Sequence, residues 1–441
     1  MRRVSRREFL LGAGVVAACG VGAAAGLSGN RWWERPLEYK SKAAPGAGGL
    51  GQTFEPPSPW SVEARYYASF SGEGALSCAS CHGTTEEPLP VSYCHTPHSG
   101  TYVQCNLCPH RCVIADGERG QCRVRENRGG RLFSMVYGNP CAVHVDPIEK
   151  KPFYHFLPSV PAFSLATAGC NLRCLYCQNW SISQVTAEET QNVDLPPEAV
   201  VRYAQEYEAP VIAYTYSEPT AFYEYMLATA QLARGAGLRN VVISAGFINP
   251  EPLRELCAAV DAIKIDLKGY DEEFYREVCG GELGPVLESI RTIYESGTHL
   301  EIVNLVVPTL NDDLEQLRSL ARWVARDLSP DVPLHFSRFH PQYKLTNLPP
   351  TPIETLERAR NIALEEGVRF VYVGNIPGHP GNHTTCPACG QTIVLRQGFA
   401  VREYHLRGGK CAYCGEPIPG VWWPGEPEGQ PVEVPPGPPD Q

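Results

Sequence analysis

The sequence predicts an α/β fold whose largest part is a partial (β/α)6 TIM-like barrel, with a cysteine-rich N-terminal module before it and a zinc-ribbon-like C-terminal module after it. Three observations support this prediction. The chain has 441 residues, which is too long for one ordinary domain. Short β-rich runs alternate with amphipathic stretches in its middle part, which is typical of parallel βαβ units. Most of its 18 cysteines fall in C-x2-C pairs, which indicate metal or cluster ligands rather than a disulfide framework.

Composition and motif positions divide the chain into successive segments. In chain order they are a signal or membrane anchor, a Pro/Gly-rich linker, a possible haem segment, a four-cysteine module, the barrel, a second four-cysteine module and a disordered tail: residues 1–30, 31–60, 61–100, 101–145, 146–377, 378–421 and 422–441. The net charge of -10 argues against general affinity for nucleic acids, which would need a basic face.

The N-terminus carries an export pattern. Ser5-Arg6-Arg7-Glu8-Phe9-Leu10 is a twin-arginine (Tat) motif, and an uncharged run rich in glycine and alanine follows it to Leu27. We expect export through the Tat pathway or tethering on the periplasmic side of a membrane, and a cytoplasmic protein if the signal is not used. Cys19 ends a lipobox-like run, so it is either a lipidation site or a small apolar residue.

The segment after the linker contains Cys78-Ala79-Ser80-Cys81-His82. C-x-x-C-H is the attachment pattern of c-type haem, in which both cysteines form thioethers and the histidine is an axial ligand. The second axial ligand would then be one of three residues: His95, His98 or Met135. The alternative is a zinc site, or a leftover cysteine site, that includes Cys94.

A second cysteine array follows at Cys105, Cys108, Cys112 and Cys122, with the spacing C-x2-C-x3-C-x9-C. Four thiols this close in a loop-rich segment can close a site around zinc or hold a [4Fe–4S] cluster, and the sequence leaves the metal open. The alternative is a set of buried thiols. Cys141 stands alone and is read as a core residue or the remnant of a disulfide.

The barrel is predicted from its alternating pattern. The β-rich runs lie at 162–168, 210–216, 239–245, 261–267, 299–307 and 332–338, and amphipathic stretches such as 220–236 and 312–327 lie between them. Six such units are two short of a complete (β/α)8 barrel, and a further run at 369–374 is expected to add a flanking strand. Active-site residues of such barrels lie at the C-terminal ends of the strands, so motifs at these ends are the candidates for the active site.

The loop after the first strand carries three cysteines, Cys170, Cys174 and Cys177, with the spacing C-x3-C-x2-C. Three thiolates on one short loop can hold three irons of a [4Fe–4S] cluster, whereas ferredoxin-type clusters use four cysteines. The fourth iron is then open, and an open metal position is the arrangement that binds and activates a small molecule. This loop is therefore the predicted catalytic centre.

Three further strand ends carry polar candidates. Glu218-Pro219 follows the second strand, and the alternative for Glu218 is an ordinary helix N-terminal residue. Lys264, Asp266 and Lys268 share the inward face of the fourth strand, where three charges are costly unless they bind something. His340 follows the sixth strand, and its alternative is a capped loop residue.

The C-terminal module contains two C-x2-C-Gly knuckles formed by Cys386, Cys389, Cys411 and Cys414. Two short strands are expected between them, at 393–395 and 399–401. This pattern is typical of a closed, four-coordinate zinc ribbon or rubredoxin-like site, with zinc preferred over iron. Its role could be structural only, because the segment is too small to fold around a core of its own.

The assembled motifs resemble those of the radical S-adenosylmethionine (SAM) superfamily. Within it the match is closest to the AmmeMemoRadiSam-system radical SAM enzymes, which are pyruvate formate-lyase activating enzyme-like, and it covers about residues 100–421. The strings that carry it are Cys108-Pro-His-Arg-Cys112, Arg125-Glu-Asn127, Val143 to Pro152, Ala168 to Trp180, Tyr216-Ser-Glu-Pro219 and Asn375-Ile-Pro-Gly-His379.

The resemblance implies that a [4Fe–4S] cluster on Cys170, Cys174 and Cys177 binds SAM through its open iron and cleaves it to a 5′-deoxyadenosyl radical. It also implies a set of SAM-contacting residues. Glu218-Pro219 stand where the superfamily has a Gly-Gly-Glu-Pro-like motif for the SAM amine, Asp266 and Lys268 match an Asp-x-Lys motif of glycyl-radical-enzyme activases, and His340 matches the activase histidine near the methionine moiety; Tyr176 of the cluster loop joins this set.

The sequence therefore predicts a radical SAM oxidoreductase that acts on an unknown substrate. An electron donor is required, and electrons could enter through the haem segment or the Cys105–Cys122 array. A barrel open at its side would suit a protein substrate, and membrane contact is expected only through the N-terminal segment. Two alternatives stay open: an activase of a glycyl radical enzyme, and an exported multi-centre electron-transfer protein without SAM chemistry.

Overall fold

The computed structural model describes residues 58–71 and 101–422. The predicted signal, residues 31–57 of the linker, Cys19 and the haem motif Cys78-Cys81-His82 lie outside the described residues, as do Cys94, His95, His98 and most of the tail. Met135, the remaining candidate for a haem ligand, is buried. No helix among the described residues is long and apolar enough to cross a membrane.

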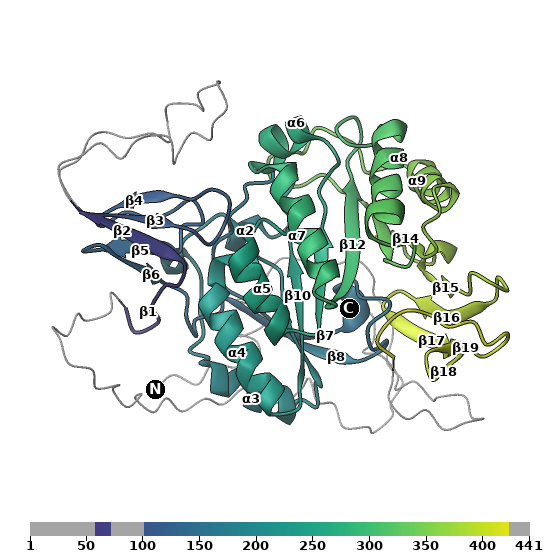
Figure 1. Ribbon diagram of the computed structural model, residues 1–441, viewed down its shortest axis with the longest axis horizontal. Helices are drawn as coiled ribbons and strands as arrows, with labels where there is room; N and C mark the ends of the chain where they lie inside the picture. The colour runs from purple at the N-terminus through teal and green to yellow at the C-terminus, as the bar shows by residue number, and fades with distance from the viewer. Residues whose placement is uncertain (1–57, 72–100, 423–441) are drawn as a thin grey trace, which may run out of the picture.

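The centre of the molecule is an eight-stranded sheet in the order β14-β13-β12-β11-β10-β9-β8-β7 (Figure 1). All neighbours from β8 to β14 are parallel, and β7 is antiparallel to β8. The strands span Ala142–Pro147 (β7), Pro161–Ala166 (β8), Val211–Tyr214 (β9), Arg239–Ser244 (β10), Ala262–Asp266 (β11), His299–Val306 (β12), Leu334–Arg338 (β13) and Val371–Gly374 (β14).

The predicted strand positions are confirmed, but the predicted sheet was too small. The run at 369–374 does more than flank the barrel, because β14 pairs with β13 as a full parallel member. The antiparallel edge strand β7 was not predicted at all. The apolar Val143 and Val145 alternate with the polar His144 and Asp146, which is a strand pattern. The charged residues that follow them obscure this signal.

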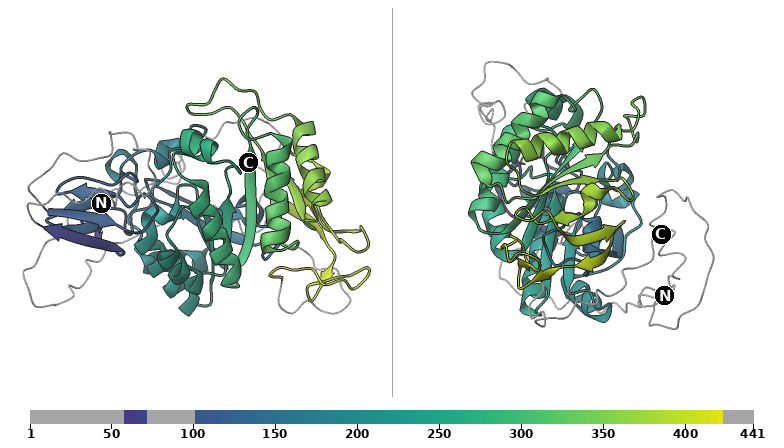
Figure 2. Two further views of the ribbon diagram at one scale, coloured as in Figure 1. Left: turned by 45° about the horizontal axis from the view of Figure 1, so that its top comes forward. Right: turned by 90° about the vertical axis from the view of Figure 1, so that its right-hand side faces the viewer.

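Helices between the strands cover the outer face of the sheet (Figures 1 and 2). The α-helices span Trp180–Ser183 (α2), Pro197–Glu206 (α3), Tyr223–Gly235 (α4), Pro250–Ala259 (α5), Glu272–Phe274 (α6), Leu283–Glu295 (α7), Leu314–Trp323 (α8) and Ile353–Glu365 (α9). Short 3-10 turns lie at Ile148–Lys150 (η4), Ala187–Glu189 (η5), Pro219–Phe222 (η6) and Pro380–Asn382 (η9), and π-helical turns at Tyr275–Cys279 (η7) and Val324–Leu328 (η8). The main apolar core lies between these helices and the sheet.

The amino ends of the strands are closed by the segment between β7 and β8. Phe153 and Phe156 of this segment pack with Ala162, Val211 and Val241 in a separate apolar cluster. Because this end is filled, the opposite end, where the strands terminate, is the accessible end of the sheet. That end is where parallel α/β sheets place their reactive groups.

Two small antiparallel sheets precede the central sheet and lie at one end of the molecule (Figure 1). Their orders are β1-β6-β5 and β2-β3-β4. The strands span Val62–Glu63 (β1), Tyr67–Ser71 (β2), Thr101–Cys105 (β3), Val113–Ala115 (β4), Arg125–Arg128 (β5) and Arg131–Ser134 (β6). The cysteines of the Cys105–Cys122 array therefore lie at the end of β3 and in the loops around β4.

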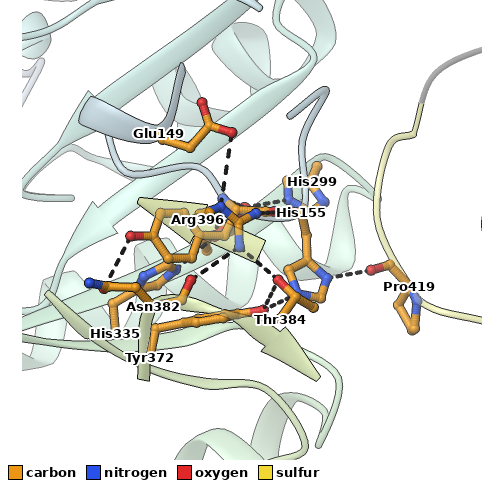
Figure 3. Close-up of polar contacts among 11 residues, drawn as sticks. Glu149, His155, His299, His335, Tyr372, Asn382, Thr384, Arg396 and Pro419 are labelled. Carbon is orange, nitrogen blue, oxygen red and sulfur yellow. Dashed lines mark hydrogen bonds and ion pairs between the residues drawn. The ribbon is translucent and has the colours of Figure 1, made fainter. Parts of the chain in front are cut away.

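The C-terminal segment forms small sheets at the other end of the molecule: Thr384–Thr385 (β15), Thr392–Gln397 (β16), Ala400–Tyr404 (β17), Leu406–Arg407 (β18) and Lys410–Cys411 (β19). The two strands predicted there are β16 and part of β17. A buried polar network joins this segment to the barrel (Figure 3). Arg396 donates to the carbonyl of Tyr154 over 2.9 Å and to Thr384 over 2.9 Å, and its guanidinium lies 4.0 Å from the Tyr154 ring centroid.

Candidate active site at the carboxyl end of the sheet

The loop with Cys170, Cys174 and Cys177 leaves the carboxyl end of β8, as expected for a catalytic loop in this type of fold. Its entry is tightly packed. Gly169 has φ +93°, and a Cβ at this position would lie 2.6 Å from the carbonyl oxygen of Cys122. Only glycine fits both the backbone conformation and this close approach.

Backbone hydrogen bonds hold the loop in one conformation. The amides of Arg173 and Leu175 donate to the carbonyls of Cys279 and Val278, each over 2.9 Å. The amide of Gly169 donates to Ile182 in α2 over 2.9 Å. A loop fixed this way can present several ligands without paying ordering entropy on binding.

Cys174 is buried, and Cys170 and Cys177 are half-buried. Burial raises the pKa of Cys170 and of Cys177, the latter to about 11, and the nearby Glu218 carboxylate raises the pKa of Cys170 further. The contact with the Cys279 thiol is the main cause that raises the pKa of Cys174, and burial adds to it. The thiol of Cys170 feels the charges of Cys174 and Cys177, and that of Cys177 feels the charge of Cys174, so the three face a common space. Thiols in such a place become thiolates when a cationic metal centre compensates their charge.

The spacing of the thiols distinguishes a cluster from a single ion. Four sulfurs around one zinc at about 2.3 Å are about 3.8 Å apart in a tetrahedron. Within residues 58–71 and 101–422, the one group of three or more ligand atoms that lie within 4.8 Å of one another is Cys386, Cys389, Cys411 and Cys414. The Cys170 loop is thus more open than a zinc site, which fits a cluster whose thiolates sit on different irons.

Glu218 is buried and its carboxylate already accepts four hydrogen bonds. Oε1 accepts from Ser244 Oγ over 2.6 Å and from the amide and hydroxyl of Thr220, whereas Oε2 accepts only from the amide of Ala245, over 2.8 Å. The alternative reading of Glu218 is therefore correct in part, because it caps the turn η6 that begins at Pro219. Oε2 keeps capacity for one more donor.

Lys264, Asp266 and Lys268 share one face of β11 and its extension, as predicted, and they pair with one another. Asp266 accepts from Lys264 and, over 3.1 Å, from Lys268. Although burial raises the pKa of Asp266, the two lysines outweigh it and hold that pKa at about 2. The cost of burying these charges is offset inside the triad, and one positive charge is left over beside the thiol loop.

The two remaining candidates differ in burial. Tyr176 is buried, and its hydroxyl lies 3.6 Å from the thiol of Cys279. His340 is exposed in the loop after β13. The strand ends therefore bring Glu218, Asp266 and Lys268 around the cysteine loop, while His340 lies at the rim of the same end.

Two polar groups near the site were missed by the sequence analysis. Asp146 of β7 accepts hydrogen bonds from Lys151 over 2.5 Å and from the hydroxyl of Tyr216, which lies two residues before Glu218. Cys279 ends the turn η7 and contacts both Cys174 and Tyr176. The motif string from Val143 to Pro152 contains Asp146 and Lys151 and was the sequence signal for this pair. Cys279 stands alone in the sequence, so no spacing pattern marked it.

The C-terminal cysteines have the geometry of a closed site. Cys386 and Cys414 have their sulfurs 3.6 Å apart, and those of Cys389 and Cys411 are 3.8 Å apart. These separations match four sulfurs around one tetrahedral ion. The prediction of a four-cysteine metal site in this module is thus supported by its geometry.

Comparison with known proteins identifies related chains. The family model described as Radical SAM superfamily matches residues 164–321. An uncharacterized protein of Methanocaldococcus jannaschii is 48% identical over 318 residues, which are 72% of this chain and 95% of that protein. A pyruvate formate-lyase-activating enzyme of Staphylococcus epidermidis is 28% identical over 232 residues, 49% of this chain and 90% of the enzyme. The solved structure of a radical SAM methyltransferase from Sphaerobacter thermophilus is 16% identical, with a TM-score of 0.40, over 54% of this chain and 71% of its own.

Proposed function

Because the chain belongs to the radical SAM superfamily and is an enzyme of that kind, we propose that it cleaves SAM reductively at a [4Fe–4S] cluster held by Cys170, Cys174 and Cys177. The observation that carries the proposal is the placement of three thiols, at wider than zinc spacing, on one rigid loop at the open end of the sheet. The bound cluster would supply one electron to the sulfonium of SAM, which generates a 5′-deoxyadenosyl radical. The same proposal includes its assignment to the AmmeMemoRadiSam-system enzymes, whose motifs its sequence resembles.

The protein's own groups would bind and orient SAM. Glu218 Oε2 can accept a hydrogen bond from the SAM ammonium, a charge-assisted contact. Lys268 would bind the SAM carboxylate, with Asp266 fixing its ammonium in place. Tyr176, Pro219 and His340 complete the proposed set at the same end of the sheet. Orientation and exclusion of water are the protein's share of such chemistry.

We propose a protein or another large molecule as the substrate. The sheet ends in β7 at one edge and β14 at the other, with no pairing between these two strands in the described structure. An incomplete barrel leaves a side entrance to its active end. Radical chemistry on a macromolecule needs such access, because the reacting atom is attached to a large body.

Anaerobic reconstitution with iron, sulfide, SAM and dithionite tests the proposal. The wild-type protein should release 5′-deoxyadenosine, and Cys170→Ala should lower this release by a factor of about 100 or more, because the cluster loses a ligand. If no 5′-deoxyadenosine forms, and Cys170→Ala leaves every redox signal of the protein unchanged, the SAM-cleaving function is excluded. An electron-transfer protein would then be the better assignment.

Activation of a glycyl radical enzyme is a second candidate. Its support is the similarity to the S. epidermidis activating enzyme, which extends over 90% of that enzyme, and the Asp266–Lys268 pair. The test is electron paramagnetic resonance (EPR) of a partner polypeptide encoded nearby in the same genome. A glycyl radical doublet on the partner, dependent on SAM and this protein, would favour the activase. Its absence with 5′-deoxyadenosine still formed would favour a different substrate.

We also propose two further cofactor sites and an exported location for the protein. The C-terminal cysteines would hold one zinc, and a chelation assay should then release about one zinc per chain. Covalent haem at Cys78 and Cys81 should give a haem-stained band on a denaturing gel. Export through the Tat pathway should be abolished by replacing Arg6 and Arg7 with lysine, as measured by cell fractionation.

A further inference from the structure

The cysteines of the N-terminal array converge on one pocket. Cys105, Cys108, Cys112 and Cys122 line the same pocket, which is partly open to solvent. Cys105, Cys108 and Cys122 are buried and Cys112 is half-buried. The Cys108 thiol feels the charges of the other three, so all four sulfurs face the same interior. A loop-rich fold that turns four thiols inward is a metal-binding arrangement.

Thiol spacing argues for a cluster over a single zinc ion in this pocket. The C-terminal cysteines have the sulfur separations of a tetrahedral zinc site. The N-terminal four form no group of three with all sulfurs within 4.8 Å, in the part of the chain that the structure describes. The three sulfurs of the Cys170 loop likewise do not all lie within 4.8 Å of one another. Four thiolates on four different irons stand farther apart than four ligands of one ion.

Arg125 provides an independent sign of a missing group. Its side chain is 2% exposed and lines the pocket, and Nη2 pairs with Glu224 Oε2 over 2.5 Å. Nε and Nη1 have no hydrogen-bond partner among the described residues. Its charge acts on the thiols of Cys105 and Cys122. Two unmade bonds on a buried guanidinium are costly, and an anionic iron–sulfur centre would accept them through its sulfurs.

The pocket adjoins the loop of the candidate active site. His110, between Cys108 and Cys112, has Nε2 2.7 Å from the carbonyl oxygen of Asn171, the residue after Cys170. Gly169, the residue before Cys170, packs against the carbonyl of Cys122. Asn171 itself lines the pocket. The two cysteine loops are therefore in direct contact on both sides of Cys170, through the His110 side chain on one side and the Cys122 carbonyl on the other.

From these observations we propose that Cys105, Cys108, Cys112 and Cys122 bind a second [4Fe–4S] cluster, which delivers electrons to the cluster on the Cys170 loop. A low-potential one-electron donor of the ferredoxin or flavodoxin class reduces the second cluster from the 2+ to the 1+ state. It returns to 2+ as the first cluster accepts that electron and passes it into the S–C5′ bond of SAM, which yields methionine and the 5′-deoxyadenosyl radical. The proposal that a second cluster binds does not depend on the proposed function, whereas the electron-delivery step rests on it.

Metal analysis of the anaerobically reconstituted full chain tests the binding. The wild type should contain about eight irons and eight sulfides, since each [4Fe–4S] cluster holds four of each. Both the Cys105→Ser/Cys112→Ser variant and the Cys170→Ala/Cys174→Ala/Cys177→Ala variant should retain about four of each. Cys141→Ser, a half-buried cysteine outside both sets, should retain all eight. About four irons in the wild type, with the Cys105→Ser/Cys112→Ser variant unchanged or lower only in zinc, would overturn the proposal.

EPR of the dithionite-reduced variants separates the two centres. The variant without the Cys170 set should keep a cluster signal that SAM does not perturb, and the variant without the Cys105 set should keep one that SAM shifts. If Cys105→Ser/Cys112→Ser does not fold, judged by circular dichroism, the single variant Cys112→Ala replaces it, because Cys112 is half-buried. Its iron content should fall below that of the wild type, and an unchanged content and spectrum would contradict the assignment.

The delivery step has its own measurement. In Cys105→Ser/Cys112→Ser, release of 5′-deoxyadenosine driven by reduced flavodoxin should fall at least about tenfold, whereas release driven by dithionite, a small reductant, should stay within about threefold of the wild type. Equal loss with both reductants, or loss with neither, would exclude the relay. If the wild type holds eight irons and releases no 5′-deoxyadenosine with either reductant, the proposed function fails while the second cluster remains.

Discussion

The hydroxyl of Ser244 donates a hydrogen bond to Glu218 Oε1 over 2.6 Å and so joins the end of β10 to the turn after β9. The same carboxylate accepts from the amide of Ala245, over 2.8 Å, through its other oxygen. Two neighbouring strand ends are thereby locked by one buried side chain. The lock orients Oε2, the oxygen with spare acceptor capacity, before any ligand arrives, and such preorganisation reduces the entropic cost of binding.

Glu218→Gln should weaken SAM binding about 10- to 100-fold. The substitution keeps the size of the side chain but removes the charge that a SAM ammonium would meet, and a hydrogen bond to a charged group contributes about 1.5–3 kcal/mol. Ser244→Ala should have a smaller effect, because the carboxylate keeps its charge and three of its donors. The measurement is titration of the reduced-cluster EPR signal with SAM.

Ser289→Ala is the matched control for this experiment. Ser289 is a buried serine of α7 whose hydroxyl donates to the carbonyl of Ile248 instead of to Glu218. It should bind SAM like the wild type. Wild-type affinity in Glu218→Gln would show that Glu218 acts only as the cap of η6.

Asp266→Asn should destabilise the fold by about 3–5 kcal/mol, because it leaves the ammonium of Lys264, which is 3% exposed, without its carboxylate partner. Urea unfolding at pH 7 measures this. The double variant Lys264→Met/Asp266→Asn should recover part of the loss, since it removes the stranded charge. If the loss of unfolding free energy in the double variant equals the sum of the losses in Lys264→Met and Asp266→Asn, the two residues are not coupled.

The same triad has a predictable pH dependence. The pKa of Asp266 is held at about 2, below the ordinary value of 3.8 that applies in the unfolded chain. The unfolded state then binds more protons between these values, so the contribution of Asp266 to stability is complete above about pH 4 and is lost as the pH falls toward 2. Acid unfolding of wild type and Asp266→Asn should therefore converge at the low end of this range.

Much of this architecture was accessible from the sequence because its signals are local. Short β-rich runs between amphipathic stretches located the parallel strands, and cysteine spacing located all three described thiol sets. Cys279 could not be found this way, since its place beside Cys174 depends on the amides of Arg173 and Leu175 binding to carbonyls about a hundred residues away. Glu301 is a similar case. It is a charged residue on a buried strand, and only the folded chain brings the amides of Tyr154 and His155 and the ring of His335 to its carboxylate.

His155 should make the stability of the protein fall between pH 7 and 5. Its ring is buried, with Nδ1 2.7 Å from the carbonyl of Pro419 and Nε2 2.6 Å from the hydroxyl of Tyr372 (Figure 3). Burial lowers the pKa of His155 from 6.5 to about 4, although the carboxylate of Glu301 opposes this and His299 and Arg396 assist it. In the unfolded chain His155 therefore binds a proton near pH 6.5, whereas in the folded chain it stays neutral until the pH is much lower. The free energy of unfolding thus declines as the pH falls through this range.

Urea unfolding at pH 7.5 and 5.0 measures this effect. The wild type should lose about 2 kcal/mol more than His155→Gln, which is less stable at neutral pH but has no ring to titrate. His405→Gln, in the same module, should keep the wild-type pH dependence, because His405 bonds to the surface residue Glu403. Equal pH dependence in wild type and His155→Gln would show that the barrel's contact with the C-terminal module does not respond to this histidine.

Cys279 should tune the cluster on the neighbouring loop without binding to it. Its thiol contacts that of Cys174 and lies 3.6 Å from the hydroxyl of Tyr176. Once Cys174 is a cluster thiolate, Cys279 carries the proton between them and donates to the Cys174 sulfur. Hydrogen bonds to cluster sulfurs stabilise the reduced, more negative state and raise the reduction potential. Cys279→Ala should therefore keep the iron content of the wild type and lower the midpoint potential.

An EPR-monitored redox titration reads this shift, and iron analysis of the same samples separates a donor from a ligand. Cys279→Ser keeps a donor at the position and should move the potential less than Cys279→Ala. Cys257→Ala removes another buried cysteine, in α5 and beside Thr298, and should change neither the potential nor the iron content. A loss of iron in Cys279→Ala would instead make this thiol a fourth ligand. That result would close the open iron and contradict the cluster geometry on which the SAM-binding proposal depends.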